Sequence, residues 1–83
     1  MSSLTVELVS PESRLWSGEA SVVNARTIEG DIGILPNHSE LLGVLTEGEI
    51  SIKAVDGSEH KFNLKGGFIS VAKNRVSILG ESE

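Results

Sequence analysis

Alternation of apolar and polar residues dominates the chain and predicts β-strands. In residues 4–9 (LTVELV), Leu4, Val6 and Leu8 fall on one face of an extended backbone. Residues 49–55 (EISIKAV) repeat this period of two. Helical periodicity is nearly absent from the sequence, so the pattern favours an all-β domain.

The second half of the chain predicts a run of hairpins. Asp56-Gly57 follows the alternating run at 49–55, and an Asp-Gly pair in this position predicts a type I′ turn with two residues at positive φ. Three further strands, separated by Gly66-Gly67 and Lys73-Asn74, are expected at residues 60–65, 68–72 and 75–79. The residues expected to face the core are Ile50, Ile52, Ala54, Phe62, Leu64, Val76 and Ile78.

The first half of the chain is less regular, but it also predicts strands. They are expected at residues 14–16, 19–28 and 31–35, with Ser17-Gly18 and Glu29-Gly30 as breaks. Residues 40–48 are either a further strand, which we favour, or a short buried bend. The whole chain would then hold roughly eight to ten short strands and no helix. Because each sheet must cover the apolar face of another, we predict a sandwich of two mainly antiparallel sheets in a single domain, residues 1–83.

The composition is that of a globular, acidic domain. Hydrophobic residues make up 39% of the 83 residues, and 12 acids against 7 bases give a net charge of −5. The bases are dispersed, so the chain lacks the clustered Lys and Arg that bind nucleic acid or an anionic membrane. It has no cysteine and no run of ~18 apolar residues. We therefore expect neither nucleic-acid binding nor direct membrane insertion.

His38 is the natural candidate for chemistry, because imidazole titrates near neutral pH and binds metals. Asp31 and Glu40 are close to it in sequence, and Ser39 or Ser21 would be its nucleophile. A metal site needs three or four ligands, and a triad needs an orienting carboxylate and an oxyanion hole. The spacing indicates neither, so we predict no catalytic, cofactor-binding or metal site. An enzyme or metal protein that uses His38 is the competing hypothesis.

The two glycines of EGDIGIL, Gly30 and Gly33, invite comparison with a phosphate-binding loop. Such loops need a denser glycine run and a following helix, and no helical period follows Gly33. The glycines instead predict a tight turn or bulge. Asp31 lies between them, in a position that suits either a turn residue or a contact with a basic partner.

Residues 34–45 (ILPNHSELLGVL) are the segment that most strongly suggests binding. Their apolar residues are Ile34, Leu35, Leu41, Leu42, Val44 and Leu45. This is more than one face of a small sandwich needs, so the surplus predicts an exposed apolar patch for a protein partner. Trp16 is favoured as a core residue over an interface residue, and His60 is expected on the solvated surface. The residues alone thus indicate a protein-binding module.

Three segments carry a resemblance to a known family: LVSPESRLWSGEASVV, the loop EGDIGILPNH followed by LL, and GGF leading into SVAKNRVSIL. They resemble the N-terminal domain of the epsilon subunit of bacterial F-type ATP synthase, over nearly the whole chain. The resemblance implies a flattened sandwich of about ten short strands. Many members continue into a helical hairpin that inhibits ATP hydrolysis. The 83 residues are expected to hold no such C-terminal helical domain.

The resemblance also implies a function. The chain would be a non-catalytic rotor subunit of the central stalk, without a cofactor, that couples proton translocation to ATP synthesis. Its partners would be the gamma subunit and the c-ring, which places it against the cytoplasmic side of the bacterial plasma membrane. The family positions that face the c-ring match Glu29, Gly30 and Asp31, and those that face gamma match Ser10, His38, Leu41 and Leu42. A generic β-sandwich adaptor for another partner is the alternative.

Overall fold

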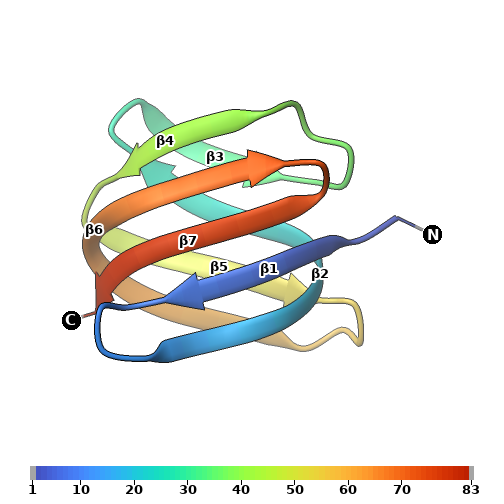
Figure 1. Ribbon diagram of the computed structural model, residues 1–83, viewed down its shortest axis with the longest axis horizontal. Coiled ribbons are helices and arrows are strands. Elements are labelled where there is room, and N and C mark those ends of the chain that lie inside the picture. Colours follow the sequence, from blue (N-terminus) through green and yellow to red (C-terminus); the bar gives the residue numbers. More distant parts are fainter. Residues whose placement is uncertain (1, 83) are drawn as a thin grey trace.

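The computed structural model describes residues 2–82, which form seven β-strands and no helix (Figure 1). The strands are β1 (Leu4–Val9), β2 (Arg14–Thr27), β3 (Gly30–Ile34), β4 (Leu41–Leu45), β5 (Gly48–Ala54), β6 (Glu59–Ala72) and β7 (Arg75–Ser82). The prediction of an all-β domain is confirmed. Over this part of the chain no helix is present that has the length and apolar character to cross a membrane.

Two long strands connect the layers of the fold. β2 and β6 have 14 residues each. β2 pairs first with β1 and then with β5 and β3, whereas β6 pairs first with β5 and then with β4 and β7. In Figure 1, β4, β6, β7 and β1 form the front layer, while β3 and β5 lie behind them. The layers therefore belong to one mixed sheet, in which β1 and β7 pair in parallel.

The prediction of two separate sheets with about ten strands is thus not what the structure shows. The difference arises because two expected breaks lie inside strands. Gly18 still pairs with Val6 across β2 and β1, and Gly67 still pairs with Gly80 across β6 and β7. Short strands expected on either side of Ser17-Gly18 and Gly66-Gly67 are consequently continuous, and the count falls to seven.

Gly66 and Gly67 bend β6 without ending it. The register with β7 shifts between Leu64 and Gly66, and the two glycines have φ of 153° and 148°. A Cβ atom on Gly67 would lie 2.7 Å from the Cα of Gly80, which no relaxation of a side chain would relieve. Glycine at this position therefore permits both the backbone angle and the close approach of β7.

The type I′ turn predicted at Asp56-Gly57 is wrong. Gly57 has a φ of 95°, but Asp56 is not at positive φ, and the Gly57 N–H donates to the Ala54 carbonyl at 3.0 Å. Asp56 Oδ1 instead accepts a hydrogen bond from the Ser58 N–H at 2.8 Å, which favours a longer loop. Two successive positive φ values occur at Lys73 and Asn74, 51° and 62°, where β6 turns into β7.

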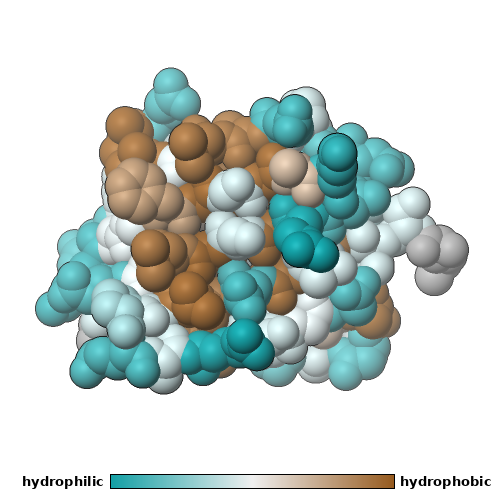
Figure 2. All heavy atoms as spheres, in the orientation of Figure 1, coloured by the Kyte–Doolittle hydropathy of each residue, from teal (hydrophilic) through white to brown (hydrophobic). Residues whose placement is uncertain are grey.

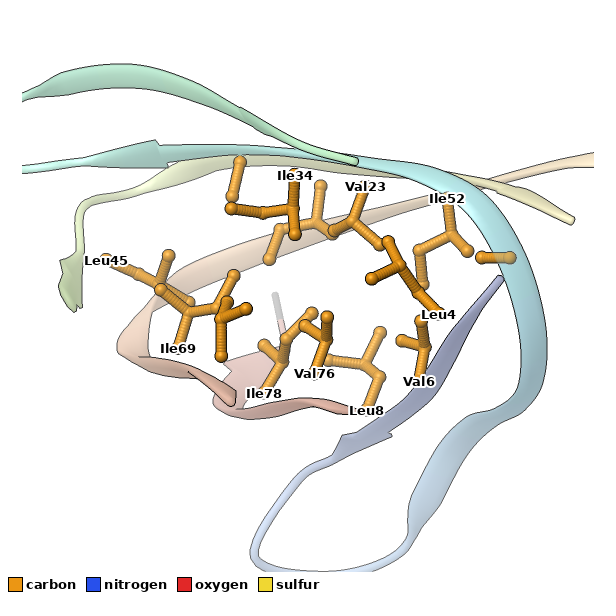
Figure 3. Close-up of a cluster of buried hydrophobic side chains, with 14 of the residues drawn as sticks. Leu4, Val6, Leu8, Val23, Ile34, Leu45, Ile52, Ile69, Val76 and Ile78 are labelled. Carbon is orange, nitrogen blue, oxygen red and sulfur yellow. The ribbon is translucent and has the colours of Figure 1, made fainter. Parts of the chain in front are cut away.

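The core lies between the layers and consists of aliphatic side chains (Figure 3). The predicted core residues Leu4, Val6, Leu8, Ile50, Ile52, Ala54, Leu64, Val76 and Ile78 are buried, and Phe62 is half-buried against them. Trp16 is half-buried and packs against this core, as favoured. His60 was expected on the solvated surface, but it is half-buried because its ring lies 5.2 Å from that of Trp16.

Replacement of Gly67 by alanine should destabilise the domain strongly. A side chain there meets the backbone of β7 in addition to the strain at positive φ, so we expect a loss of about 2 kcal/mol or more in the free energy of unfolding. Gly57→Ala is the matched control, because its φ of 95° is also strained but nothing lies within 4 Å. Urea unfolding of both variants is the measurement. Equal losses would contradict the close approach of β7.

The carboxylate of Glu19 connects β1 to β2. It accepts hydrogen bonds from Ser3 Oγ at 2.6 Å and Thr5 Oγ1 at 2.8 Å, and these lower the pKa of Glu19. A lowered pKa in the folded state means that the stabilisation is present above the unfolded pKa and is lost as the pH falls through the folded one. We expect Thr5→Val to raise the pKa of Glu19, as measured by NMR titration. Ser70→Ala, on the distant part of β6, should leave it unchanged.

Candidate protein-docking surface

Apolar side chains cross four neighbouring strands on the outer face of the front layer. Strand pairing puts Val44 of β4 beside Phe68 of β6, Phe68 beside Leu79 of β7, and Leu79 beside Val9 of β1. We call these four residues the apolar row. Val44, Phe68 and Leu79 are 42%, 53% and 48% exposed. Figure 2 shows hydrophobic side chains gathered over β4, β6 and β7 on this face.

The apolar row is the outward counterpart of the core. Ile69 and Val71 of β6 are buried, and so is Ile78 of β7. Successive side chains of a strand point to opposite faces, so these core contacts turn Phe68 and Leu79 to the outside. Exposed aromatic and leucine side chains in contact across strands are typical of a surface that a protein partner covers.

Further apolar residues extend the row at its β4 end. Leu42 lies two positions before Val44 on the same strand and is 77% exposed. Ile28, in the turn between β2 and β3, is 66% exposed, and its N–H donates to the Val44 carbonyl at 3.0 Å. On one flank, Ser70 of β6 pairs with Ser77 of β7, so the apolar surface has a polar border.

The other flank of the row is hollowed. A shallow depression beside Phe68 and Leu79 has a lining that also includes Pro11, Lys65, Gly66, Gly67, Gly80 and Glu81. Three of these lining residues are glycines, which have no side chain to cover the sheet. An apolar centre with charged residues at the margin is the usual composition of a protein interface.

The residues predicted to face gamma do not form one cluster. Leu42 is exposed on the face that carries the apolar row, but Leu41 is half-buried and packs against the core. Ser10 follows Val9 at the far end of the row. His38 lies in the loop between β3 and β4, which Figure 1 shows on the opposite side from the β1–β2 turn.

The polar groups of Ser10 and His38 already have partners in their own loops. Ser10 Oγ accepts hydrogen bonds from the N–H groups of Glu12 and Ser13, at 3.3 and 3.1 Å. His38 Nδ1 lies 2.7 Å from the Ser39 carbonyl oxygen. These contacts define the shape of the two loops, so both residues have local structural roles.

The apolar surplus predicted for residues 34–45 is divided between core and surface. Ile34 and Leu45 are buried, whereas Leu35, Leu42 and Val44 are exposed. The predicted patch therefore exists, but β6 and β7 supply as much of it as this segment does. Phe68 and Leu79 were not predicted from the sequence to belong to the exposed apolar patch. Alternation from the buried Val76 and Ile78 would have placed Leu79 outside.

The residues predicted to face the c-ring lie at the other end of β3 from His38 (Figure 1): Glu29 is in the β2–β3 turn, and Gly30 and Asp31 begin β3. Buried Thr27 fixes this turn, because its Oγ1 donates to the Gly30 carbonyl at 2.9 Å and accepts from the Glu29 N–H at 3.1 Å. Gly30 has a φ of 127°. Glu29 and Asp31 are exposed acids.

The structure does not bring His38 and Asp31 together, since Asp31 lies near the start of β3 and His38 lies in the loop after its end. Between residues 2 and 82, no group of three or more His, Asp and Glu side chains lies close enough to hold a metal ion. The geometry thus gives no support to the competing hypothesis of an enzyme or metal protein built on these residues.

Comparison with known families decides what kind of domain this is. The family described as ATP synthase, Delta/Epsilon chain, beta-sandwich domain matches residues 3–82. The chain belongs to this family. The resemblance predicted from sequence is thereby confirmed. Within this ATP synthase family, the epsilon chain is a non-catalytic subunit of the complex, so the prediction of a non-catalytic subunit is confirmed as well.

Curated bacterial relatives are named ATP synthase epsilon chain. The relative from Corynebacterium diphtheriae is 50% identical over 82 residues, which are 98% of this chain and 67% of the relative. That from Rhodococcus erythropolis is 52% identical, over 99% of this chain and 68% of the relative. The relative from Micrococcus luteus is 48% identical, over 99% of this chain and 90% of the relative. The chain thus spans about two thirds of most of these relatives and nearly all of the last.

Solved structures share the fold. A chain in the mitochondrial ATP synthase of Euglena gracilis superposes with a TM-score of 0.89 at 21% identity, over 96% of this chain and 51% of that one. A chain in the central stalk and c-ring of the Tetrahymena thermophila mitochondrial ATP synthase superposes with a TM-score of 0.79 at 24% identity, over 95% of this chain and 63% of that one. At this identity the likeness shows the fold of the chain alone.

Proposed function

We propose that this chain is a rotor subunit of the central stalk of a bacterial F-type ATP synthase, where it binds the gamma subunit and contacts the c-ring. It would couple proton translocation to ATP synthesis without catalysing either. The observation that carries the proposal is the exposed apolar row. The epsilon-chain names of the relatives, and the c-ring and central stalk in the titles of structures with the same fold, support it.

The apolar row is the proposed gamma-binding surface. Burial of apolar area contributes about 25 cal/mol per Å², so large side chains such as Phe68 and Leu79 supply most of the affinity of such a surface. Leu42 and Ser10 mark its two ends, as expected of family positions that face gamma. The proposed roles of His38 and Leu41 are indirect, because the first shapes the loop before β4 and the second anchors β4 to the core.

The β2–β3 turn is the proposed c-ring contact. Its backbone is fixed by Thr27; Glu29 offers an exposed charge at the tip, and Asp31 offers another in β3, opposite Arg26. Charged groups at the rim of an interface contribute more to orientation and to the rate of association than to affinity. The apolar row would thus hold the subunit, while the turn sets how it meets the ring.

Attachment through these two surfaces would place the subunit at the cytoplasmic side of the plasma membrane, as a peripheral member of the complex. The alternative of a generic adaptor also uses the apolar row, but it assigns no role to the turn. Variants of the turn therefore separate the two functions.

Substitution of Phe68 by serine should weaken binding to the purified gamma subunit. Loss of a central aromatic contact typically costs about 2 kcal/mol, so we expect a dissociation constant about 30-fold larger, measured by isothermal titration calorimetry. Val55→Ser is the matched control, since Val55 is 60% exposed but lies in the β5–β6 loop away from the row. A wild-type chain that fails to bind gamma at about 50 μM would count against the proposal.

Charge reversal at the turn tests the ring contact. We expect Asp31→Lys to weaken capture of a complex of the chain with gamma by detergent-solubilised c-ring, by about 5-fold at low salt and less at high salt. Binding to gamma alone should not change. If Asp31→Lys and Glu29→Lys both bind the ring as well as wild type, the turn has no role and the adaptor function is favoured.

A further inference from the structure

The loop between β3 and β4 crosses from the back layer of the fold to the front layer. It begins after buried Ile34 and ends at Leu41, which packs against the core. Leu35, the first residue of the loop, is 59% exposed, so this large apolar side chain does not anchor it. The position of the loop therefore depends on polar contacts.

A tight turn forms the first part of this loop. The His38 N–H donates to the Leu35 carbonyl at 3.1 Å, Pro36 follows Leu35, and Asn37 has a φ of 68°. Proline followed by a residue at positive φ is the signature of a type II turn, in which asparagine is tolerated at the third position. The hydrogen bond within such a turn uses only the fourth N–H, so the Asn37 N–H needs an acceptor from elsewhere.

Asn74 supplies this acceptor. Its Oδ1 accepts from the Asn37 N–H at 2.6 Å, and its Nδ2 donates to Asn37 Oδ1 at 3.4 Å. The two residues are 37 positions apart in sequence, and Figure 1 shows the β3–β4 loop beside the β6–β7 turn. Two hydrogen bonds thus join the loop to the front layer, and both involve the side chain of Asn74.

The backbone of Asn74 is itself fixed. Lys73 and Asn74 form the two-residue turn between β6 and β7, with φ of 51° and 62°, and Ala72 pairs with Arg75 on either side of it. The Asn74 carbonyl accepts from the Thr5 N–H at 2.8 Å. Asn74 therefore connects three segments at this end of the fold: β1, the β6–β7 turn and the β3–β4 loop.

We infer that Asn74 is a positioning residue, which holds the β3–β4 loop in the place from which this loop and β4 meet the gamma subunit. In the free chain this role requires no partner. For gamma it rests on the proposed function, because His38 in the loop and Leu42 in β4 are among the positions expected to face gamma. A loop that is in place before binding costs less conformational entropy when the partner binds.

Substitutions in the β6–β7 turn test this role in the free chain. Asn74→Gly removes the amide but retains a residue that adopts positive φ, and Asn74→Asp retains an acceptor oxygen. Lys73→Gly is the matched control, because it makes the same change at the neighbouring position, which also has positive φ. NMR measures the exchange of the Asn37 N–H with water, since no neighbour of Asn37 in sequence is altered. Thermal unfolding checks that each variant retains the fold.

The expected results follow from the hydrogen bonds. Loss of the acceptor should make the Asn37 N–H exchange about 5-fold faster in Asn74→Gly. Asn74→Asp should stay within about 2-fold of wild type, because its carboxylate accepts the same hydrogen bond. Lys73→Gly should also stay within about 2-fold. The Thr5 N–H should be unchanged in every variant, because its acceptor is a backbone carbonyl.

Binding of the same variants to the purified gamma subunit is then measured by isothermal titration calorimetry. We expect Asn74→Gly to bind about 3-fold more weakly, because a loop that is no longer held in place must be ordered on binding. Asn74→Asp and Lys73→Gly should bind within about 2-fold of wild type, since both retain the hydrogen bond to the Asn37 N–H.

Other results overturn the inference. If the Asn37 N–H exchanges equally fast in wild type and Asn74→Gly, the amide does not hold the loop. If Lys73→Gly has the same effect as Asn74→Gly, the turn backbone is responsible and not the amide. If exchange changes as expected but gamma binding does not, the loop has no role for gamma, and the proposed function is unaffected because the apolar row carries it. A wild-type chain that does not bind gamma overturns the proposed function and the role for gamma together, while the exchange rates still decide the role of Asn74 in the free chain.

Discussion

The alternation of side chains along β6 and β7 is the constraint from which the rest of this structure follows. Ile69, Val71 and Ile78 are required to fill the core between the layers. Because these side chains point inward, Phe68 and Leu79 point outward, since the side chains of neighbouring residues in a strand lie on opposite faces. A one-residue shift of register would bury the outer set and expose the core. The outward position of the apolar row is therefore fixed by the same contacts that stabilise the fold.

Sequence reasoning predicted most of the core because period-two patterns are local. Leu4, Val6 and Leu8 follow one another in a single strand, and their burial needs no knowledge of partners. The number of strands was harder to predict, since glycine interrupts a pattern whether it ends a strand or bends it. At Gly67 the difference lies in the approach of Gly80, which is 13 residues away in sequence and is visible only in the folded chain.

The candidate sites divide in the same way. Leu42 could be recognised from its own segment, but the apolar row joins residues of four strands, and that combination depends on register. The contact of Asn74 with Asn37 also joins segments that are 37 residues apart, although the turn at Lys73-Asn74 was expected. The type I′ turn predicted from Asp56-Gly57 was wrong. The Asp56 carboxylate accepts a hydrogen bond from the Ser58 N–H, which favours a longer loop.

The two proposed surfaces are joined by backbone hydrogen bonds. Ile28 lies in the same turn as Glu29, and its N–H donates to the carbonyl of Val44 in the apolar row; Thr46 N–H donates likewise to the Arg26 carbonyl. A force applied at the turn therefore reaches the row through β4 and β2 without passing through a mobile linker.

Such a short path matters for a subunit proposed to rotate with the stalk. In the proposed function, the apolar row would gain its affinity from buried area, which salt hardly affects, whereas the exposed charges of the turn would be screened within about 8 Å at physiological salt. In this proposal, the apolar row would keep the subunit bound to gamma, and the β2–β3 turn would set its orientation on the ring. Because the turn is braced by Thr27 and β4, a polar contact of modest strength is sufficient to define one orientation.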